Sequence, residues 1–213
     1  MTGRSFLINT EMSNPITYTR INEDFLDVHQ PSDYLDAENI IYEEVCAEIK
    51  KMQEDGTGEL YKPSINLCRL PDAYYKPDNY QELSHLVRIV PATYGQECNL
   101  NWIDVKGITD LSYIFAQSEF DGDISRWDVS NVRYMAGMFY QAVFNKDISD
   151  WDVRQVKTMK QMFAGSQFRH ITELEKWSSK IKLDCNIDRM FDDTPTEDDY
   201  GKPITLPSFY DNN

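Results

Sequence analysis

A 24-residue internal repeat constrains the fold of this chain more than any other feature of its sequence. Segments 123–139 and 147–163 carry the same residue at ten positions. These positions are Asp123, Ile124, Ser125, Trp127, Asp128, Val129, Val132, Met135, Met138 and Phe139, each matched 24 residues later. Apolar residues continue the period back to Val105, and a decayed copy ends at Met190 and Phe191. A fixed period of this length is typical of repeat architectures, in which single units stack on one another.

Each unit is predicted to contain a short β-type stretch followed by a short helix. The β-type stretch is 124–129, and the helical stretch is 132–139. In the second stretch Val132, Met135, Met138 and Phe139 have a spacing that lines one face of a helix. One unit cannot cover its own apolar face, so stacked copies should bury it. The sequence therefore predicts an α+β fold, a short solenoid of strand-plus-helix repeats over 100–191, with Phe139 stacked over Phe163.

The repeat resembles a known family. The signature that begins at Asp123 and ends at Phe139, followed by Phe144-Asn145-Lys146-Asp147, is similar to the BspA-like repeat. This family is related to leucine-rich repeats and occurs in bacterial surface proteins. The resemblance covers residues 100–191 and implies a scaffold with a non-enzymatic binding role. The repeated Asp128 and Asp152 are interpreted as turn or cap residues that bond local N–H groups.

Three regions are expected along the chain. Residues 1–99 are predicted to form an arm over 1–33 and helices at 36–54 and 79–90, with Pro91 after the second helix. This mainly helical region should cap the first repeat. Residues 100–191 form the repeat region, and residues 192–213 form an acidic tail that either lies on the body as a strap or acts as a linear binding motif.

Charge and hydropathy exclude several classes of function. The 213 residues include 36 acidic and 21 basic side chains, a formal charge of −15. The excess lies in the flanks, because residues 100–191 hold 13 acidic and 12 basic residues. A protein this acidic is repelled by phosphate backbones, so direct nucleic-acid binding is not expected. No apolar run has the length of a membrane span or of a signal-peptide core, which predicts a cytoplasmic location; surface attachment would need a signal outside this sequence.

No catalytic or metal-binding pattern stands out. The four cysteines, Cys46, Cys68, Cys98 and Cys185, have neither zinc-site nor CxxC spacing, and we expect reduced thiols unless the chain is exported. The three histidines are far apart in the sequence, and nucleophile, metalloprotease and phosphate-loop motifs are missing. The sequence therefore predicts neither an enzyme nor a cofactor.

Two classes of function remain open. The first is a non-catalytic protein–protein interaction module that binds its partner through the repeat surface. Because Tyr and Arg are common binding hot spots, the candidate contact residues are Arg126, Arg133, Tyr134, Tyr140, Arg154 and Lys157. The alternative is an acidic intracellular inhibitor, of the phage anti-defence or toxin-immunity type, that blocks a basic nucleic-acid-binding enzyme. A phage structural or accessory protein is a further alternative. Acids gathered on one face would favour the inhibitor.

Overall fold

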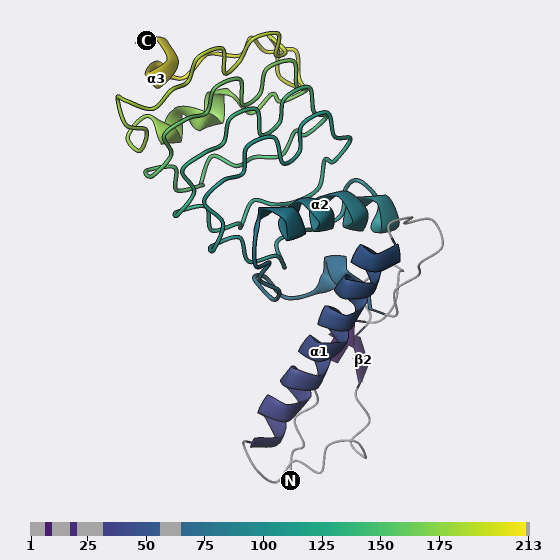
Figure 1. Cartoon of the computed structure of the whole chain (residues 1–213). Helices are drawn as coiled ribbons and strands as arrows, with labels where there is room; N and C mark the ends of the chain where they lie inside the picture. The colour runs from purple at the N-terminus through teal and green to yellow at the C-terminus, as the bar shows by residue number, and fades with distance from the viewer. Residues whose placement is uncertain (1–6, 10–17, 21–31, 56–64, 212–213) are drawn as a thin grey trace, which may run out of the picture. The chain divides into compact units, whose positions relative to one another are not determined.

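The computed structural model describes residues 7–9, 18–20, 32–55 and 65–211, and it divides into two compact units (Figure 1). The first unit covers Met1–Leu70 and the second covers Pro71–Asn213. The repeat lies entirely within the second unit.

The first unit contains a long helix and a small hairpin. Strands β1 (Leu7–Asn9) and β2 (Tyr18–Arg20) pair antiparallel. Helix α1 spans Ser32–Asp55 and contains the helix predicted at 36–54, and the short 3-10 helix η2 covers Leu67–Arg69. The α1 residues Val45, Ile49 and Met52 are buried, as their helical spacing predicts. Most of the predicted arm over 1–33 lies outside the described residues.

The second unit contains a long helix, which lies against the first coil of the repeat. Helix α2 (Tyr80–Tyr94) starts where the Asn79 side chain accepts a hydrogen bond from the backbone of Glu82. The helix predicted at 79–90 is confirmed, but it continues through Pro91 and ends at Gly95, which has φ +103°. The Tyr80 hydroxyl donates to the carbonyl of Ser112 at 2.9 Å. Figure 1 shows α2 at one end of the stacked coils.

The predicted α+β solenoid of strand-plus-helix repeats is wrong. Between residues 100 and 207 the structure describes one short 3-10 helix, η3 (Thr172–Trp177), and no strand. The stretches 124–129 and 132–139, predicted as strand and helix, are instead built from consecutive turns. Each 24-residue repeat forms a coil of turns. The bridges recorded between neighbouring coils are isolated and parallel, such as Asp110–Tyr134 and Tyr134–Thr158.

Left-handed backbone positions explain why no helix forms. Two residues of each coil, four positions apart, have φ near +50° to +70°. In successive coils these residues are Tyr113 and Gln117, Gly137 and Gln141, Gln161 and Gly165, and Arg189 and Asp193. A right-handed helix requires negative φ at every residue. These positions would therefore interrupt a helix twice in each 24-residue repeat. The apolar spacing of Met135, Met138 and Phe139 predicted their burial correctly, because a coil of turns buries the same three side chains.

The coils are joined by a ladder of hydrogen bonds between equivalent backbone groups. From Leu111 to Gln117, every second N–H donates to a carbonyl of the next coil, as in Leu111 to Tyr134 (2.8 Å) and Phe115 to Met138 (3.0 Å). The N–H groups between them close turns within their own coil, as in Ile114 to Leu111. The next two coils repeat this alternation. Backbone groups are thus satisfied across the stack rather than along a helix.

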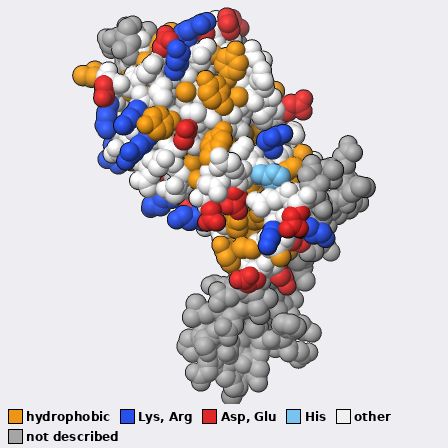
Figure 2. Space-filling view, viewed as in Figure 1, with side chains coloured by type: hydrophobic (Ala, Val, Ile, Leu, Met, Phe, Trp, Pro, Cys, Tyr) orange, Lys and Arg blue, Asp and Glu red, His pale blue; other side chains and the backbone are white. Residues whose placement is uncertain are grey.

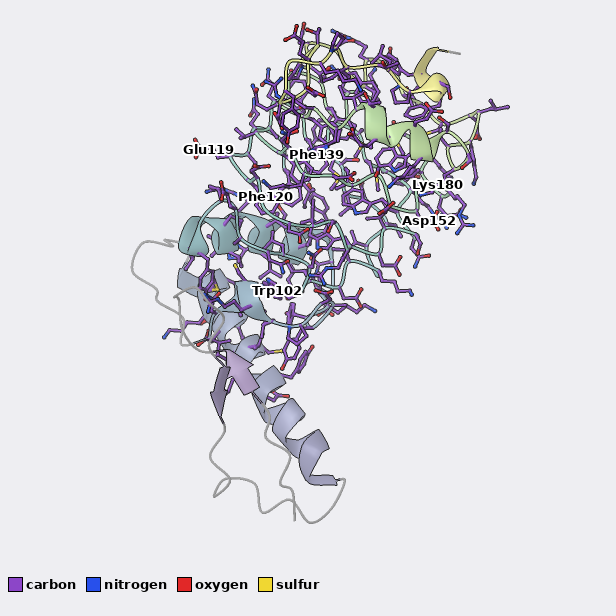
Figure 3. All side chains as sticks on the ribbon, turned by 180° about the vertical axis from the view of Figure 1, so that it is seen from behind. Trp102, Glu119, Phe120, Phe139, Asp152 and Lys180 are labelled. Carbon is purple, nitrogen blue, oxygen red and sulfur yellow. The ribbon has the colours of Figure 1, made fainter. Side chains whose placement is uncertain are left out.

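Stacked aromatic rings fill the interior of the coils. Phe115, Phe139, Phe163 and Phe191 form one column with ring centroids 5.6–5.8 Å apart, and the predicted stacking of Phe139 on Phe163 is confirmed. A second column joins Phe120, Phe144 and Phe168. Phe139 and Phe120 point into the stack from different segments in Figure 3. Such pairs stabilise the core beyond their buried area.

The last residues of the chain return to the side of the final coils. Ser208, which opens the short helix α3 (Ser208–Asp211), donates its backbone N–H to Glu175 at 2.7 Å. Two residues later, the ring of Tyr210 packs edge-on against Phe191 at 5.1 Å. These contacts hold residues 208–210 against the repeat, as expected for a strap.

Candidate interaction face

We define the rung face as the exposed side of the hydrogen-bond ladder, formed by residues 109–117, 133–141 and 157–165. Since the ladder fixes the register, side chains 24 residues apart lie on neighbouring coils. On the side of the molecule shown in Figure 2, exposed hydrophobic-class side chains, a class that includes tyrosine, form separate clusters between charged groups.

Two cations are stacked on the rung face without a carboxylate between them. The backbone N–H of Lys157 donates to the carbonyl of Arg133 at 2.8 Å, so the two residues lie on adjacent coils. Both side chains are exposed. Within the described part of the chain, neither side chain makes an ion pair or a hydrogen bond. Like charges in neighbouring positions repel each other, so their placement brings the fold no electrostatic stabilisation.

Tyrosines accompany these cations. Tyr134 follows Arg133 directly, and 40% of its surface is exposed. Tyr113, on the preceding coil, is 56% exposed, and its ring lies over Gly137, where an added Cβ would meet the ring at 2.2 Å. Residue type and spacing did not single out Tyr113. The signal available was the glycine 24 residues later, because only a residue without a side chain leaves room for the ring.

A polar groove of about 390 Å³ opens beside Arg133. Ser130, Asn131, Arg133, Asp152, Arg154 and Gln155 line it. Arg154 bonds both carboxylate oxygens of Asp152, with Nε at 2.8 Å and Nη2 at 2.5 Å. These hydrogen bonds are the main reason why the pKa of Asp152 is lowered to about 2. The charge of Arg154 is therefore paired with a carboxylate two residues away, whereas Arg133 has no ion pair among the described residues.

The structure brings together only some of the six predicted contact residues. Arg133, Tyr134 and Lys157 form one cluster, and Arg154 lies across the groove from Arg133. Arg126 is engaged elsewhere, because its guanidinium pairs with Asp72 at 2.7 Å. Tyr140 is half-buried and lies six residues beyond Tyr134 on the same coil.

The repeated aspartates have the local role predicted for them. Asp128 accepts a hydrogen bond from the backbone of Ser130, and Asp152 accepts one from the backbone of Arg154. Hydrogen bonds from the Ser130 side chain and backbone lower the pKa of Asp128. Asp104, Asp110, Asp123 and Asp147 each accept the same kind of bond from the residue two positions later. These carboxylates stabilise the turns of the coils by accepting local backbone N–H groups.

Cations interleave with many other carboxylates of the second unit. Five further ion pairs involve Asp121, Asp150, Asp188, Asp192 and Asp199. Figure 3 places Asp152 and Lys180 on one side of the coils and Glu119 on the opposite side. Charges of both signs therefore alternate along the coils.

The described residues also bear on metal binding and membrane insertion. Among the described residues, no three His, Cys, Asp or Glu side chains are grouped so that they could hold a metal ion. None of the helices described in either unit combines the length and the apolar character needed to cross a bilayer. Cys46, Cys68, Cys98 and Cys185 are free thiols.

Comparison with known proteins identifies one related family. The family described as "Mycoplasma protein of unknown function, DUF285" matches residues 85–200. The match covers most of α2 and all the coils. At the level of the repeat it agrees with the BspA-like resemblance. No match was found among curated proteins or solved structures.

Proposed function

Because the chain belongs to the DUF285 family of Mycoplasma proteins of unknown function, we propose a function from its surface: a non-catalytic module that binds a protein partner through the rung face. The observation that carries the proposal is the cluster of Arg133, Tyr134 and Lys157. Two exposed cations without partners among the described residues stack on adjacent coils, and an exposed tyrosine directly follows one of them. Arg and Tyr are among the residue types enriched in binding hot spots.

The charge of the cluster indicates what kind of partner it suits. Arg133 and Lys157 are fixed on adjacent coils by a backbone hydrogen bond, and Arg133 also borders the groove. A partner surface with carboxylates would give each cation a charge-assisted hydrogen bond. Because both cations are exposed, this attraction should weaken as salt screens it over roughly 8–10 Å. We therefore propose an acidic patch on the partner.

The acidic-inhibitor alternative receives less support from the repeat. A blocker of a basic groove needs carboxylates gathered on one face. Six aspartates of the coils accept hydrogen bonds from their own turns, and five others pair with Lys or Arg. Such an arrangement supports a surface of alternating charge rather than a continuous acidic one.

Site-specific crosslinking tests the proposal. A photoreactive phenylalanine analogue replaces Tyr134 in one variant and Glu119 in the control variant, since Figure 3 places Glu119 on the opposite side of the coils from Asp152. We expect one protein from the native host to crosslink at position 134 only. Equal crosslinking at both positions would contradict the proposal.

Charge reversal at the cluster is the second test of the proposal. Arg133→Glu combined with Lys157→Glu should reduce the crosslinking at position 134 at least tenfold. The matched control is Lys76→Glu combined with Arg88→Glu, which changes the net charge equally at exposed residues outside the rung face. Crosslinking that falls equally in both double variants would assign the binding to net charge alone and would refute the rung face as the site.

A further inference from the structure

The coil farthest from α2 ends in an open edge of the ladder. At the three earlier junctions, alternate N–H groups of one coil donate to carbonyls of the next. By the same alternation, the N–H groups of Ile187, Arg189, Phe191 and Asp193 point away from the stack. The carbonyls of Asn186, Asp188, Met190 and Asp192 accept bonds from the preceding coil. Within the described residues, Ile187 and Arg189 have no backbone acceptor.

A groove follows the open half of this edge. It has a volume of about 410 Å³ and is lined by Cys185, Asn186, Ile187, Asp188, Arg189 and Tyr210. The ring of Tyr210 covers Phe191 edge-on at 5.1 Å, so the strap at residues 208–210 closes the other half. The site thus offers two N–H donors, a groove beside them and an aromatic wall at one end.

We propose that this edge binds a basic peptide segment of a partner protein, which adopts the turn conformation of the repeat and continues the ladder as its next rung. The three existing junctions define the occupant, because each one seats a backbone of consecutive turns whose carbonyls accept alternate N–H groups. Edges of this kind bind peptides through main-chain hydrogen bonds. The exposed carboxylates of Asp184 and Asp193 make no ion pair among the described residues and favour Lys or Arg in the peptide.

This edge is a different surface from the rung face. The rung face consists of side chains on residues 109–117, 133–141 and 157–165, whereas the edge consists of backbone groups of the final coil. The opposite end of the stack is not an equivalent site, because α2 lies against the first coil and Tyr80 occupies the carbonyl of Ser112. The inference therefore does not depend on the proposed function.

The chain itself supplies a probe. Residues 157–166, Lys-Thr-Met-Lys-Gln-Met-Phe-Ala-Gly-Ser, present the carbonyls that seat the preceding coil, and they include two lysines. A synthetic peptide of this sequence is added to the full-length protein, and amide hydrogen exchange is followed by NMR. We expect exchange at Ile187 and Arg189 to slow at least tenfold at saturation. A peptide of the same composition in scrambled order should leave these two amides unchanged.

Two variants test whether the peptide occupies this edge and not another surface of the molecule. Tyr210→Ala should extend the protection to the amide of Phe191, whereas Tyr200→Ala, at a tyrosine that is 96% exposed, should not. The Arg133→Glu, Lys157→Glu variant should bind the peptide as the natural protein does. Should Tyr210→Ala fail to fold, the exchange measurement on the natural chain decides alone. Unchanged exchange at Ile187 and Arg189, or equal slowing by the scrambled peptide, would overturn the proposal.

Discussion

Replacing Trp151 by alanine tests how the coils are held together. The Trp151 side chain is 2% exposed, and its indole Nε1 donates to the carbonyl of Ile124 in the preceding coil at 3.3 Å. Trp127 and Trp177 make corresponding bonds to Leu100 (2.9 Å) and Ser149 (3.0 Å). Each tryptophan thus fills the interior of its own coil and ties it to the coil before.

The expected loss has two parts. Truncating a buried tryptophan to alanine costs about 3–5 kcal/mol in packing. Losing the indole bond costs a further 0.5–1.5 kcal/mol, roughly, because the Ile124 carbonyl still accepts the backbone N–H of Trp127 at 3.1 Å. Because these parts overlap, we expect Trp151→Ala to lower the free energy of unfolding by about 4–6 kcal/mol. Trp151→Phe keeps a ring but loses the bond, and should cost about 2–3 kcal/mol.

Urea unfolding followed by circular dichroism measures both variants. The slope of the free energy against urea should stay constant, so that the midpoints report stability alone. Tyr134→Ala is the control, and we expect a change within about 0.5 kcal/mol because that side chain lies on the surface. A loss below about 1 kcal/mol for Trp151→Ala would refute the reasoning. It would mean that Trp151 is not a buried tie between coils.

Three further predictions follow from individual residues. Gln161→Gly should raise the melting temperature, with a gain of about 0.5–1 kcal/mol, since Gln161 has φ +54°, whereas Gln155→Gly, at a residue without positive φ, should lower it. Because the pKa of Asp152 is lowered to about 2, its contribution to stability should be present above its ordinary value of 3.8 and be lost as the pH falls through about 2. Arg154→Ala should return that pKa towards 3.8 in a carboxyl NMR titration. Burial, assisted by the nearby acid, raises the pKa of Cys185 to about 11, so its thiol should resist a thiol reagent at pH 8 until urea unfolds the chain.

The candidate sites were only partly predictable. Residue type alone selected Arg133, Tyr134 and Lys157 together with Arg126, Tyr140 and Arg154. Whether a guanidinium is free or paired depends on residues distant in the sequence, as in the pair of Arg126 with Asp72. The open edge at Ile187 and Arg189 was not predictable, because it requires knowing which carbonyls the neighbouring coil supplies.

The sequence by itself determined the period, the register and the buried residues of the repeat. Identity at a 24-residue offset places Phe139 on Phe163, and the apolar spacing selects Val132, Met135 and Met138 for the interior. These features are set by side-chain hydrophobicity, which is a property of each residue and its spacing.

Only the tertiary structure decided the backbone conformation of each 24-residue repeat. The spacing of Met135, Met138 and Phe139 suits a helix and a coil of turns equally well. The choice depends on where the N–H groups find acceptors. In this chain alternate groups donate to the next coil, as Met135 does to Thr158 at 2.9 Å. That ladder holds Tyr113 and Gln161 in left-handed positions that neither residue favours alone. Because these bonds join residues about 24 positions apart, local sequence pattern could not reveal them.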